Sequence, residues 1–426
     1  MAGYKSASDV GPHAKIDLDM AEFETMVGKY DDATEPDWYT KAMKIFDMGG
    51  GELCSADDVA AATAGTATTW CADTDTPLGN SQKSTSVRTL KGFATKDYST
   101  DKLTGKDGGK YGEQLPPIYT AYWADATKGG YTAAEAKIWA DTFVRKDYTS
   151  IVQPAGSNQL MKKGANYQAV WMYVLHELED AIGDCYDGDI YANDGTPTGG
   201  APHAWDEGWA FYAGSQVAAT AADSVTDDGT LIWELAEKRG SDFNTQHSTG
   251  PATVNVNLLA EFIAGRDLII NAKCTEAEPI IDNIITQMSI PLIQGTLKYA
   301  YSSDPASGSY CASDAGKTAM SASDDCVKAW AEGWAFAAGI LPRINECSAA
   351  AATTIKTNLD ITATEPVKDG YAAVLAAMES TYTCLGITAA DVGTYKGIPA
   401  PASDSATAPA LALGAAAAAA GAALLL

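Results

Sequence analysis

A twelve-residue stretch of this chain, residues 203–214, returns in close copy at residues 328–339. The offset of 125 residues is constant, which predicts a duplicated unit. On a helix, the two tryptophans of each copy share one face, beside a line of small residues that carries one glutamate, Glu207 or Glu332. Small residues let another helix come close, so this glutamate should be desolvated and must be protonated, paired or bound to a cation. The alternative is a structural repeat whose glutamate bridges to a buried Arg or Lys.

Apolar residues follow helical spacing along most of the chain, and strand-like alternation is nearly absent. We therefore predict an all-α protein, a duplicated antiparallel helical bundle with two pseudo-repeats and a loop-rich N-terminal region. The expected regions are N-terminal helices and disulfide-tied loops at 1–114, a first helical repeat with the candidate metal site at 115–245, a second, degenerate helical repeat at 254–395, and a linker with a C-terminal anchor signal at 396–426.

The charge balance excludes one class of partner. The 426 residues include 29 Lys and Arg against 55 Asp and Glu, a formal net charge of −26. No nucleic acid is expected as a partner, because a polyanion is repelled where a basic footprint is needed. An acidic surface is typical of a soluble protein in salty surroundings or of one that gathers cations.

The eight cysteines are spread widely and form no Cys-x-x-Cys motif, so neither a zinc knuckle nor a thioredoxin-type site is supported. Their even number predicts disulfide bonds and an oxidising compartment. Many pairings are open, but two local ones are reasonable: Cys54 with Cys71, and a bridge among Cys311, Cys326 and Cys347.

The C-terminal residues resemble a membrane-attachment signal. Residues 400–409 form a linker rich in Pro, Ser and Ala, and residues 410–426 are an uninterrupted Ala/Leu/Gly tail without a positive charge. Small residues at 403–405, followed by a short spacer and a hydrophobic tail, predict a glycosylphosphatidylinositol (GPI) anchor. The alternative is a single membrane-spanning anchor. Both readings place the folded part outside the membrane.

Side chains suited to metal binding are concentrated on two predicted helices of the first repeat, 158–183 and 203–222. Each helix carries a histidine followed by carboxylates at i+3 and i+4, so the donors share one side of the helix. If the two helices pack as neighbours, imidazole, carboxylate and phenol groups meet. Such oxygen-rich ligation with one or two imidazoles suits a hard or borderline cation such as ferric iron. The candidate metal ligands are His176, Glu179, Asp180, His203, Glu207, Tyr173 and Tyr212.

The second copy of the repeated stretch lacks most of these donors. His203 is replaced by Lys328 and Asp206 by Ala331, and only the glutamate, Glu332, is kept. If metal binding is real, it should therefore lie mainly in the first half of the chain.

Each candidate also has an ordinary structural explanation. His176 could be a helix-face histidine bonded to Asp180, and His203 could merely fix the start of its helix. Glu179, Asp180 and Asp206 could be solvated surface residues. The chain contains no nucleophile elbow, P-loop, dinucleotide fingerprint or His-Glu-x-x-His motif that would indicate a common enzyme class.

Several longer segments carry a resemblance to a known family. The chain resembles the algal iron-assimilating, low-iron-inducible periplasmic proteins and their relatives, the phytotransferrins. The matching segments are 88–94, 171–181, 203–214, 235–239, 291–295 and 332–343. The resemblance implies a cell-surface or periplasmic protein that binds Fe(3+), with carbonate as companion anion, and serves high-affinity iron uptake. A surface reductase or an endocytic partner would take the iron onward.

In the transferrin-like scheme that this resemblance implies, an arginine holds the carbonate, and Arg239 and Arg266 are the candidates. The protein is then expected not to be an enzyme. The spacing of His176 and Glu179 also resembles imelysin-type periplasmic proteins, which keeps a metal-dependent hydrolase open as an alternative. A third reading is a metal-free structural cell-surface protein whose repeated stretch is core packing.

Overall fold

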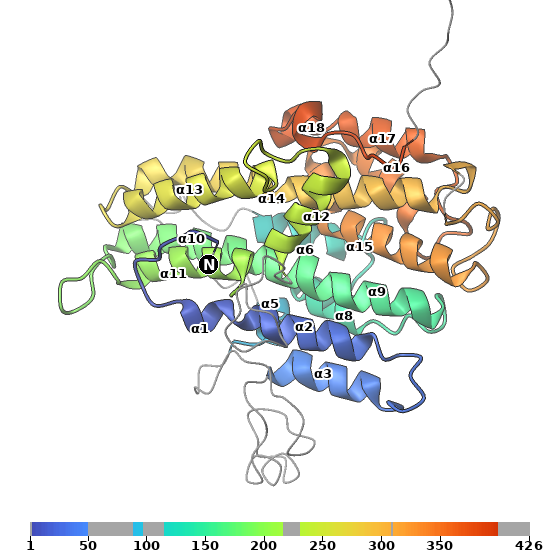
Figure 1. The fold of residues 1–426 in the computed structure, drawn as a ribbon, viewed down its shortest axis with the longest axis horizontal. Coiled ribbons are helices and arrows are strands. Elements are labelled where there is room, and N and C mark those ends of the chain that lie inside the picture. The colour runs from blue at the N-terminus through green and yellow to red at the C-terminus, as the bar shows by residue number, and fades with distance from the viewer. Residues whose placement is uncertain (1, 50–87, 97–114, 216–230, 308–309, 399–426) are drawn as a thin grey trace, which may run out of the picture.

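The fold is that of a computed structural model, which describes residues 2–49, 88–96, 115–215, 231–307 and 310–398 (Figure 1). Within these ranges every regular element is a helix, and the one β-type contact is an isolated bridge between Gln246 and Ala252. The predicted all-α class is confirmed.

The first half of the chain supplies the helices that surround the candidate site. Their bounds are α1 Gly11–Ala14, α2 Ile16–Val27, α3 Trp38–Met48, α5 Leu90–Ala94, α6 Leu115–Ala124, α7 Ala133–Lys137, α8 Trp139–Arg145, α9 Pro154–Gly164, the π-helix η1 Ala165–Val170, α10 Trp171–Asp187 and α11 Gly200–Ala213. The run from α9 through η1 to α10 is continuous, so the π-turns interrupt one long helix just before the residues of the site.

The second half contains the longest helices. Their bounds are α12 Ile232–Phe243, α13 Thr253–Ile269, α14 Cys274–Ser303, the 3-10 turn η2 Pro305–Ser307, α15 Asp324–Cys347, α16 Ala349–Leu359, α17 Tyr371–Glu379, α18 Tyr382–Leu385 and α19 Ala389–Val392. The break between α13 and α14 falls at 270–273, where Ala272 has a positive φ, and Pro279 lies inside α14.

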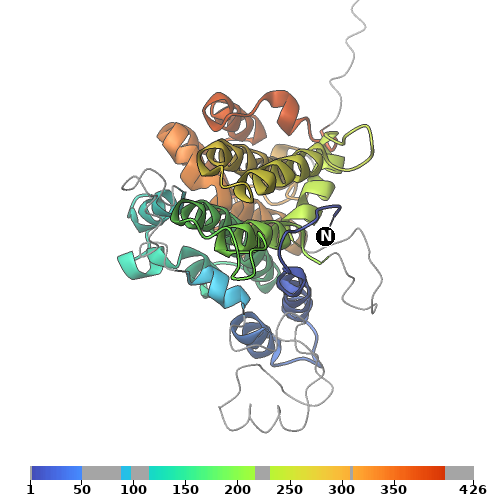
Figure 2. The ribbon, with the colours of Figure 1, turned by 90° about the vertical axis from the view of Figure 1, so that its left-hand side faces the viewer.

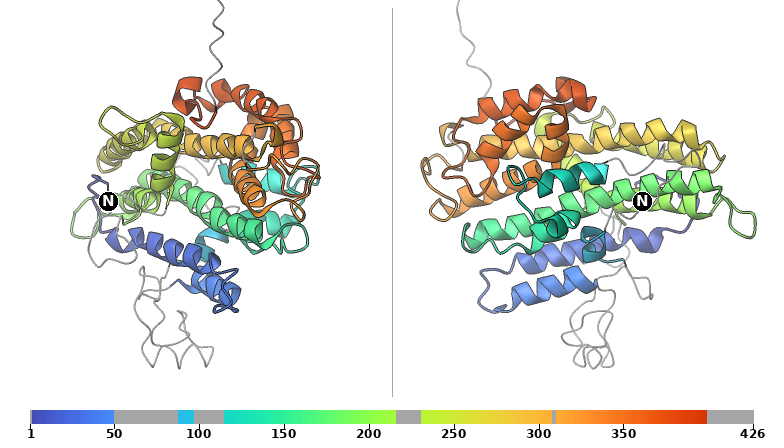
Figure 3. Two further views of the ribbon diagram at one scale, coloured as in Figure 1. Left: turned by 45° about the vertical axis from the view of Figure 1, so that its right-hand side comes forward. Right: turned by 180° about the vertical axis from the view of Figure 1, so that it is seen from behind.

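The long helices run side by side in stacked layers (Figures 1 and 2). The pair α2 and α3 covers one face, α9 to α11 and α15 form the middle, and α16 to α18 lie at the opposite face (Figure 3). The most extensive helix contacts are α10 with α11 and α14 with α15. The two copies of the repeated stretch lie on α11 and α15, so each copy belongs to one of these closely packed pairs.

The copies are anchored in the same way. The indole Nε1 of Trp205 donates to the carbonyl of Phe262 at 2.9 Å, and that of Trp330 donates to the carbonyl of Leu359 at 3.0 Å. The glycine after each glutamate allows close helix contact: a Cβ at Gly208 would meet the side chain of Leu178 at 3.0 Å. Duplication of a common unit remains our hypothesis for this likeness.

Three disulfides link separate segments in the described part of the chain. They join Cys185 to Cys274, Cys311 to Cys326 and Cys347 to Cys384. The expected bridge among Cys311, Cys326 and Cys347 is thus formed by the first two, while Cys54 and Cys71 lie outside the described residues. These bonds agree with an oxidising compartment.

No helix in the described ranges is both long enough and apolar enough to cross a membrane. The predicted C-terminal anchor signal, residues 403–426, lies outside these ranges.

Candidate metal centre

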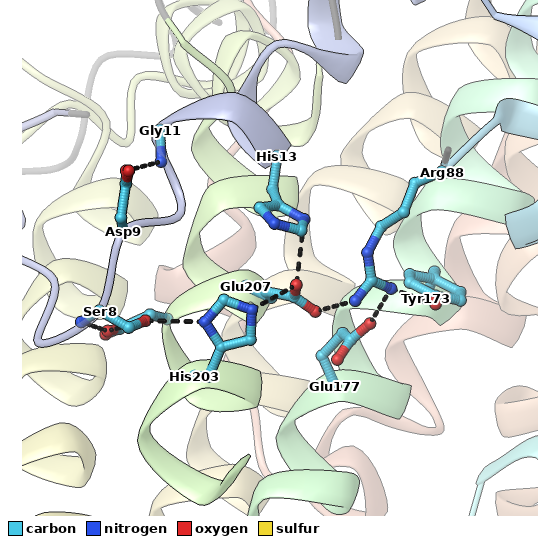
Figure 4. Close-up of polar contacts among 10 residues, drawn as sticks. Ser8, Asp9, Gly11, His13, Arg88, Tyr173, Glu177, His203 and Glu207 are labelled. Atoms are coloured by element: carbon cyan, nitrogen blue, oxygen red, sulfur yellow. Dashed lines mark hydrogen bonds and ion pairs between the residues drawn. The ribbon is translucent and has the colours of Figure 1, made fainter. Parts of the chain in front are cut away.

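The candidate site forms where the short helix α1 crosses α11. His203 and Glu207 are four residues apart on α11, so their side chains lie on one face of that helix. His13 comes from α1, where Pro12 occupies the first turn, a position at which its missing N–H is no loss. Val10 and Ala14 on either side of His13 are buried against Ala210 of α11, and this small apolar contact aims the His13 ring at Glu207 (Figure 4).

Two imidazole nitrogens converge on one carboxylate oxygen. Nδ1 of His13 lies 3.0 Å and Nε2 of His203 lies 3.1 Å from Oε1 of Glu207. One ligand atom from each residue lies within 4.8 Å of the others, which makes these three a group able to hold a metal ion. Glu207 is 1% exposed, whereas both histidines are partly open to solvent.

The spacing is compatible with metal ligation. Within the described residues, neither Nδ1 of His13 nor Oε1 of Glu207 has a partner with hydrogen-bond alignment, although both atoms are buried. Two metal bonds of about 2.1 Å that meet at a right angle place their ligand atoms about 3.0 Å apart. The observed separations from Oε1 of Glu207, 3.0 and 3.1 Å, match this value. Two imidazoles and one carboxylate suit iron or zinc and leave coordination positions open.

Arg88 borders the cluster on the side away from the histidines (Figure 4). Its Nη2 forms an ion pair with Oε2 of Glu207, and its Nη1 lies 2.7 Å from Oε1 of Glu177. The same Nη1 donates to the hydroxyl of Tyr173 at 2.5 Å. One guanidinium thus holds two buried carboxylates, while Oε1 of Glu207 still faces the imidazoles.

The charged groups shift one another's pKa. Burial and the neighbouring Glu207 raise the pKa of Glu177 to about 8, although Arg88 opposes them. Desolvation would also raise the pKa of Glu207, but the two imidazoles and Arg88 outweigh it and hold that pKa below its ordinary value. Contact with Glu207 raises the pKa of His203. Near neutral pH, Glu207 therefore carries the negative charge that a cation needs, and Glu177 is largely protonated.

A second layer orients His203. Its Nδ1 lies 3.0 Å from the hydroxyl of Ser8. Ser8 in turn donates its backbone N–H to Oδ2 of Asp206 at 2.8 Å, and Tyr4 donates to Oδ1 of Asp206 at 2.6 Å. With Nδ1 engaged by Ser8, Nε2 of His203 faces Glu207, which is the arrangement of a second-shell partner in a metal site.

Of the seven candidate ligands, the structure brings His203 and Glu207 together. Tyr173 lies one step away, bonded to Arg88. Three candidates on α10 lie outside the group, namely His176, Glu179 and Asp180. The reason is the helical period. Tyr173 and Glu177 are four residues apart and face α11. His176 lies one residue before Glu177 and Glu179 two residues after it, so both side chains point to other sides of α10. The ring centroids of His176 and Tyr173 lie 5.2 Å apart, and Asp180 lies near Asp184.

The remaining candidate residues, one tyrosine and two arginines, make contacts away from the cluster. Tyr212 donates to Oδ1 of Asn255 at 2.5 Å, on the side of α11 that faces α13. Arg266 lies over the Tyr4 ring and pairs with Asp267. Arg239 belongs to α12 and faces Asp242 in the second half of the structure.

Three residues at or beside the cluster were not among the residues predicted from the sequence: His13, Arg88 and Glu177. His13 stands in a short segment without helical periodicity, so nothing marked it except its scarcity as one of four histidines. Arg88 opens the segment 88–94, which was noted for its resemblance but not for its charge. Glu177 directly follows His176, and only a fixed helix rotation distinguishes it from Glu179.

Comparison with known proteins identifies a family. A family model described as low iron-inducible periplasmic protein matches residues 1–411. This range includes both copies of the repeated stretch and every residue of the cluster. Searches among curated proteins and among solved structures find no match.

Proposed function

Because this chain belongs to the low iron-inducible periplasmic protein family, we propose that it binds ferric iron outside the plasma membrane and delivers it to high-affinity uptake. The protein is then a carrier, with iron as its cargo, and not an enzyme. The family's description links it to iron supply and to the periplasm, and names no reaction.

The observation that carries this proposal is the convergence of His13, His203 and Glu207. These residues supply two neutral donors and one anionic oxygen to a common point. The nearby Glu177 and Tyr173 are held by Arg88, so they support the carboxylate and do not compete for the cation. A tyrosine is thus outside the first set of ligands, and we expect iron binding without a strong phenolate band.

We further propose that a carbonate ion completes the coordination shell. The three ligands leave open positions on an octahedral ion, and a carbonate can fill two of them. Neither candidate arginine lies at the cluster, because Arg239 and Arg266 contact other groups, and both Nη atoms of Arg88 are engaged by Glu177, Tyr173 and Glu207.

The test is an iron titration of the whole protein with and without bicarbonate, read by metal analysis after desalting. We expect one iron per chain, and tighter binding when bicarbonate is present. Glu207→Gln should weaken the binding strongly, because the amide keeps the shape but loses the charge. Glu332→Gln, at the matching position of the second copy, is the control and should bind iron normally. Equal loss in both variants would refute this location of the site.

One observation favours a second candidate function. Two histidines and one carboxylate with open positions are also a donor set of catalytic zinc sites. A metal-dependent hydrolase would show ester or peptide hydrolysis that zinc restores after chelation. A carrier would show iron retention without such turnover.

The location outside the cell is part of the same proposal. The family description supports a periplasmic or extracellular place, and the disulfides agree with it. We propose a GPI anchor attached near residues 403–405 and a surface reductase or endocytic partner that accepts the iron. Mass spectrometry of the mature surface protein should then find no peptide containing Leu426.

A further inference from the structure

The chain crosses the metal centre as a strap, residues 5–14, before it enters α2. Both flanks of the strap are fixed, because Tyr4 on one side and Ile16 on the other belong to the main hydrophobic core. Within the strap, the buried residues pack in a small separate cluster against α11. Helix α1 has four residues, too few to be stable without tertiary contacts. The strap, which carries His13, therefore depends on contacts with α11 for its position.

Asp206 of α11 is the acceptor that the polar groups of this segment share. Tyr4 donates its hydroxyl to Oδ1 of Asp206 at 2.6 Å. Ser8 donates its backbone N–H and its hydroxyl to Oδ2 at 2.8 and 3.0 Å. Asp206 is 0% exposed, so it is not the solvated surface residue that its type alone would suggest. Both of its oxygens are engaged by the strap and by the residue that precedes it.

The same hydrogen bonds decide which nitrogen of His203 carries the proton. An ionised carboxylate can only accept, so the hydroxyl of Ser8 donates to Asp206. The oxygen of that hydroxyl then accepts from Nδ1 of His203, 3.0 Å away. With the proton on Nδ1, the lone pair of Nε2 is free, and Nε2 lies 3.1 Å from Oε1 of Glu207. Neutral His203 is thereby kept in the tautomer that binds a cation through Nε2.

The second copy of the repeated stretch indicates that helix packing does not require this carboxylate. Ala331 occupies the position of Asp206 and Lys328 that of His203, whereas the tryptophans and Glu332 are kept. Ala331 is fully buried as well, so an alanine suffices at this place in α15. A buried carboxylate costs free energy unless its hydrogen bonds offset the loss of water. The carboxylate and the histidine occur together in the copy that the strap crosses, and both are missing from the other copy.

We propose that Asp206 is the positioning residue of the metal centre and that it acts on both histidines. It fixes the tautomer of His203 through Ser8, and it holds the strap that carries His13. This role rests on the proposed iron-binding function and adds a control to the same site. Because His13 belongs to the strap, bound iron holds the strap more firmly against α11. By thermodynamic linkage, release of the strap weakens iron binding by the same factor.

The test combines the ferric-iron affinity of the whole chain with hydrogen exchange of residues 5–14, read by mass spectrometry. Asp206→Ala introduces the residue of the second copy. It should weaken iron binding by roughly 10–100-fold or more and speed exchange in the iron-free strap, while exchange in α14 and α15 stays unchanged. Asp206→Asn should largely restore both properties, because its amide oxygen accepts from Ser8 and its amide N–H donates to the Tyr4 hydroxyl. Iron should slow exchange of the strap in the wild type and not in His13→Ala.

A spectroscopic measurement distinguishes positioning from a general loss of stability. Pulsed electron paramagnetic resonance with one equivalent of Cu(2+) counts the coordinated imidazoles. We expect two in the wild type and in Asp206→Asn, and fewer in Asp206→Ala. Tyr4→Phe, which removes one donor to Asp206, should also loosen the strap and weaken iron binding. Its matched control is Tyr119→Phe, which removes another buried hydroxyl bond of 2.6 Å, to the carbonyl of Gly339, and should do neither.

The possible failures point to different steps. The proposal is overturned if folded Asp206→Ala keeps the wild-type iron affinity, or if its strap exchanges as slowly as that of the wild type. A loss in Asp206→Asn as large as that in Asp206→Ala would also overturn it. If Asp206→Ala does not fold, unchanged strap exchange and iron affinity in Tyr4→Phe decide against it in the same way. Failure of the wild-type protein to bind ferric iron would instead refute the proposed function and, with it, the role of Asp206 at a metal.

Discussion

The imidazole rings of His13 and His203 meet edge to face, with centroids 5.4 Å apart and ring planes at 83°. This contact is made between the first helix of the chain and α11, and Glu207 lies where the two rings converge (Figure 4). Two imidazoles so close together would repel each other if both were protonated, and they can share one cation when both are neutral.

The first prediction concerns these two histidines. His13→Ala and His203→Ala should each weaken iron binding by more than the roughly 10–100-fold that loss of a second-shell partner costs, because each removes a ligand. Equilibrium dialysis with radioactive iron measures this. The matched control is His247→Ala, since His247 is bonded to Thr249 in a turn. His176→Ala should have a small effect, and a loss as large as that of His203→Ala would restore α10 as a source of ligands.

The second prediction concerns Ser8, which lies 3.0 Å from Nδ1 of His203. Ser8→Ala should lower iron affinity by roughly 10–100-fold without unfolding the protein, because the imidazole loses its orientation. Ser8→Thr keeps a hydroxyl and should recover part of the affinity. Iron affinity equal to the wild type in Ser8→Ala would mean that Glu207 alone orients the ring.

The third prediction is a pH dependence. Contact with Glu207 raises the pKa of His203 above its ordinary value of 6.5. As the pH falls, protons therefore begin to compete with the metal for this imidazole above pH 6.5. Iron affinity should fall steeply between about pH 8 and about pH 5.5. In the iron-free protein the sign is reversed: the stability that protonated His203 contributes is fully present below about pH 6.5 and is lost as the pH rises through the raised pKa. Affinity measured at several pH values should show a shallower slope in His203→Ala.

The fourth prediction concerns Arg88. Arg88→Gln leaves the carboxylate of Glu207 buried without its guanidinium partner and removes the hydrogen bond that Arg88 donates to Glu177, which should destabilise the iron-free protein by about 3 kcal/mol. Urea unfolding followed by circular dichroism measures the change. Adding Glu177→Gln to this variant should recover part of the lost stability, and strict additivity of the two changes would argue against their coupling.

The fifth prediction concerns Glu177, whose pKa is raised to about 8 mainly by burial. The folded protein therefore binds a proton that the unfolded chain releases near pH 4.5, and stability falls as the pH rises between these values. Glu177→Gln removes this cost, so its melting temperature relative to the wild type should increase from pH 5 to pH 8.5. A difference that stays constant with pH would show that Glu177 is already ionised.

Much of the fold could be predicted from the sequence because helical periodicity is local. The repeated tryptophans mark α11 and α15, the two helices that each pack most closely with one neighbour. The desolvation of Glu207 also followed from its neighbours alone, since tryptophans at −2 and +2 and a following glycine permit no solvated position. The spacing of His203 and Glu207 placed one half of the site.

Only the tertiary structure determined the other residues of the site. The rotation of α10 about its axis selects Glu177 and leaves Glu179 outside, and this angle depends on packing that begins at the π-turns of η1. His13 and Arg88 come from segments far from α11 in the chain, with no periodicity to mark them. Sequence determines which side chains share a helix face, because that relation is set within a few residues. Which faces meet is set by the packing of the whole chain, and the site exists only where they meet.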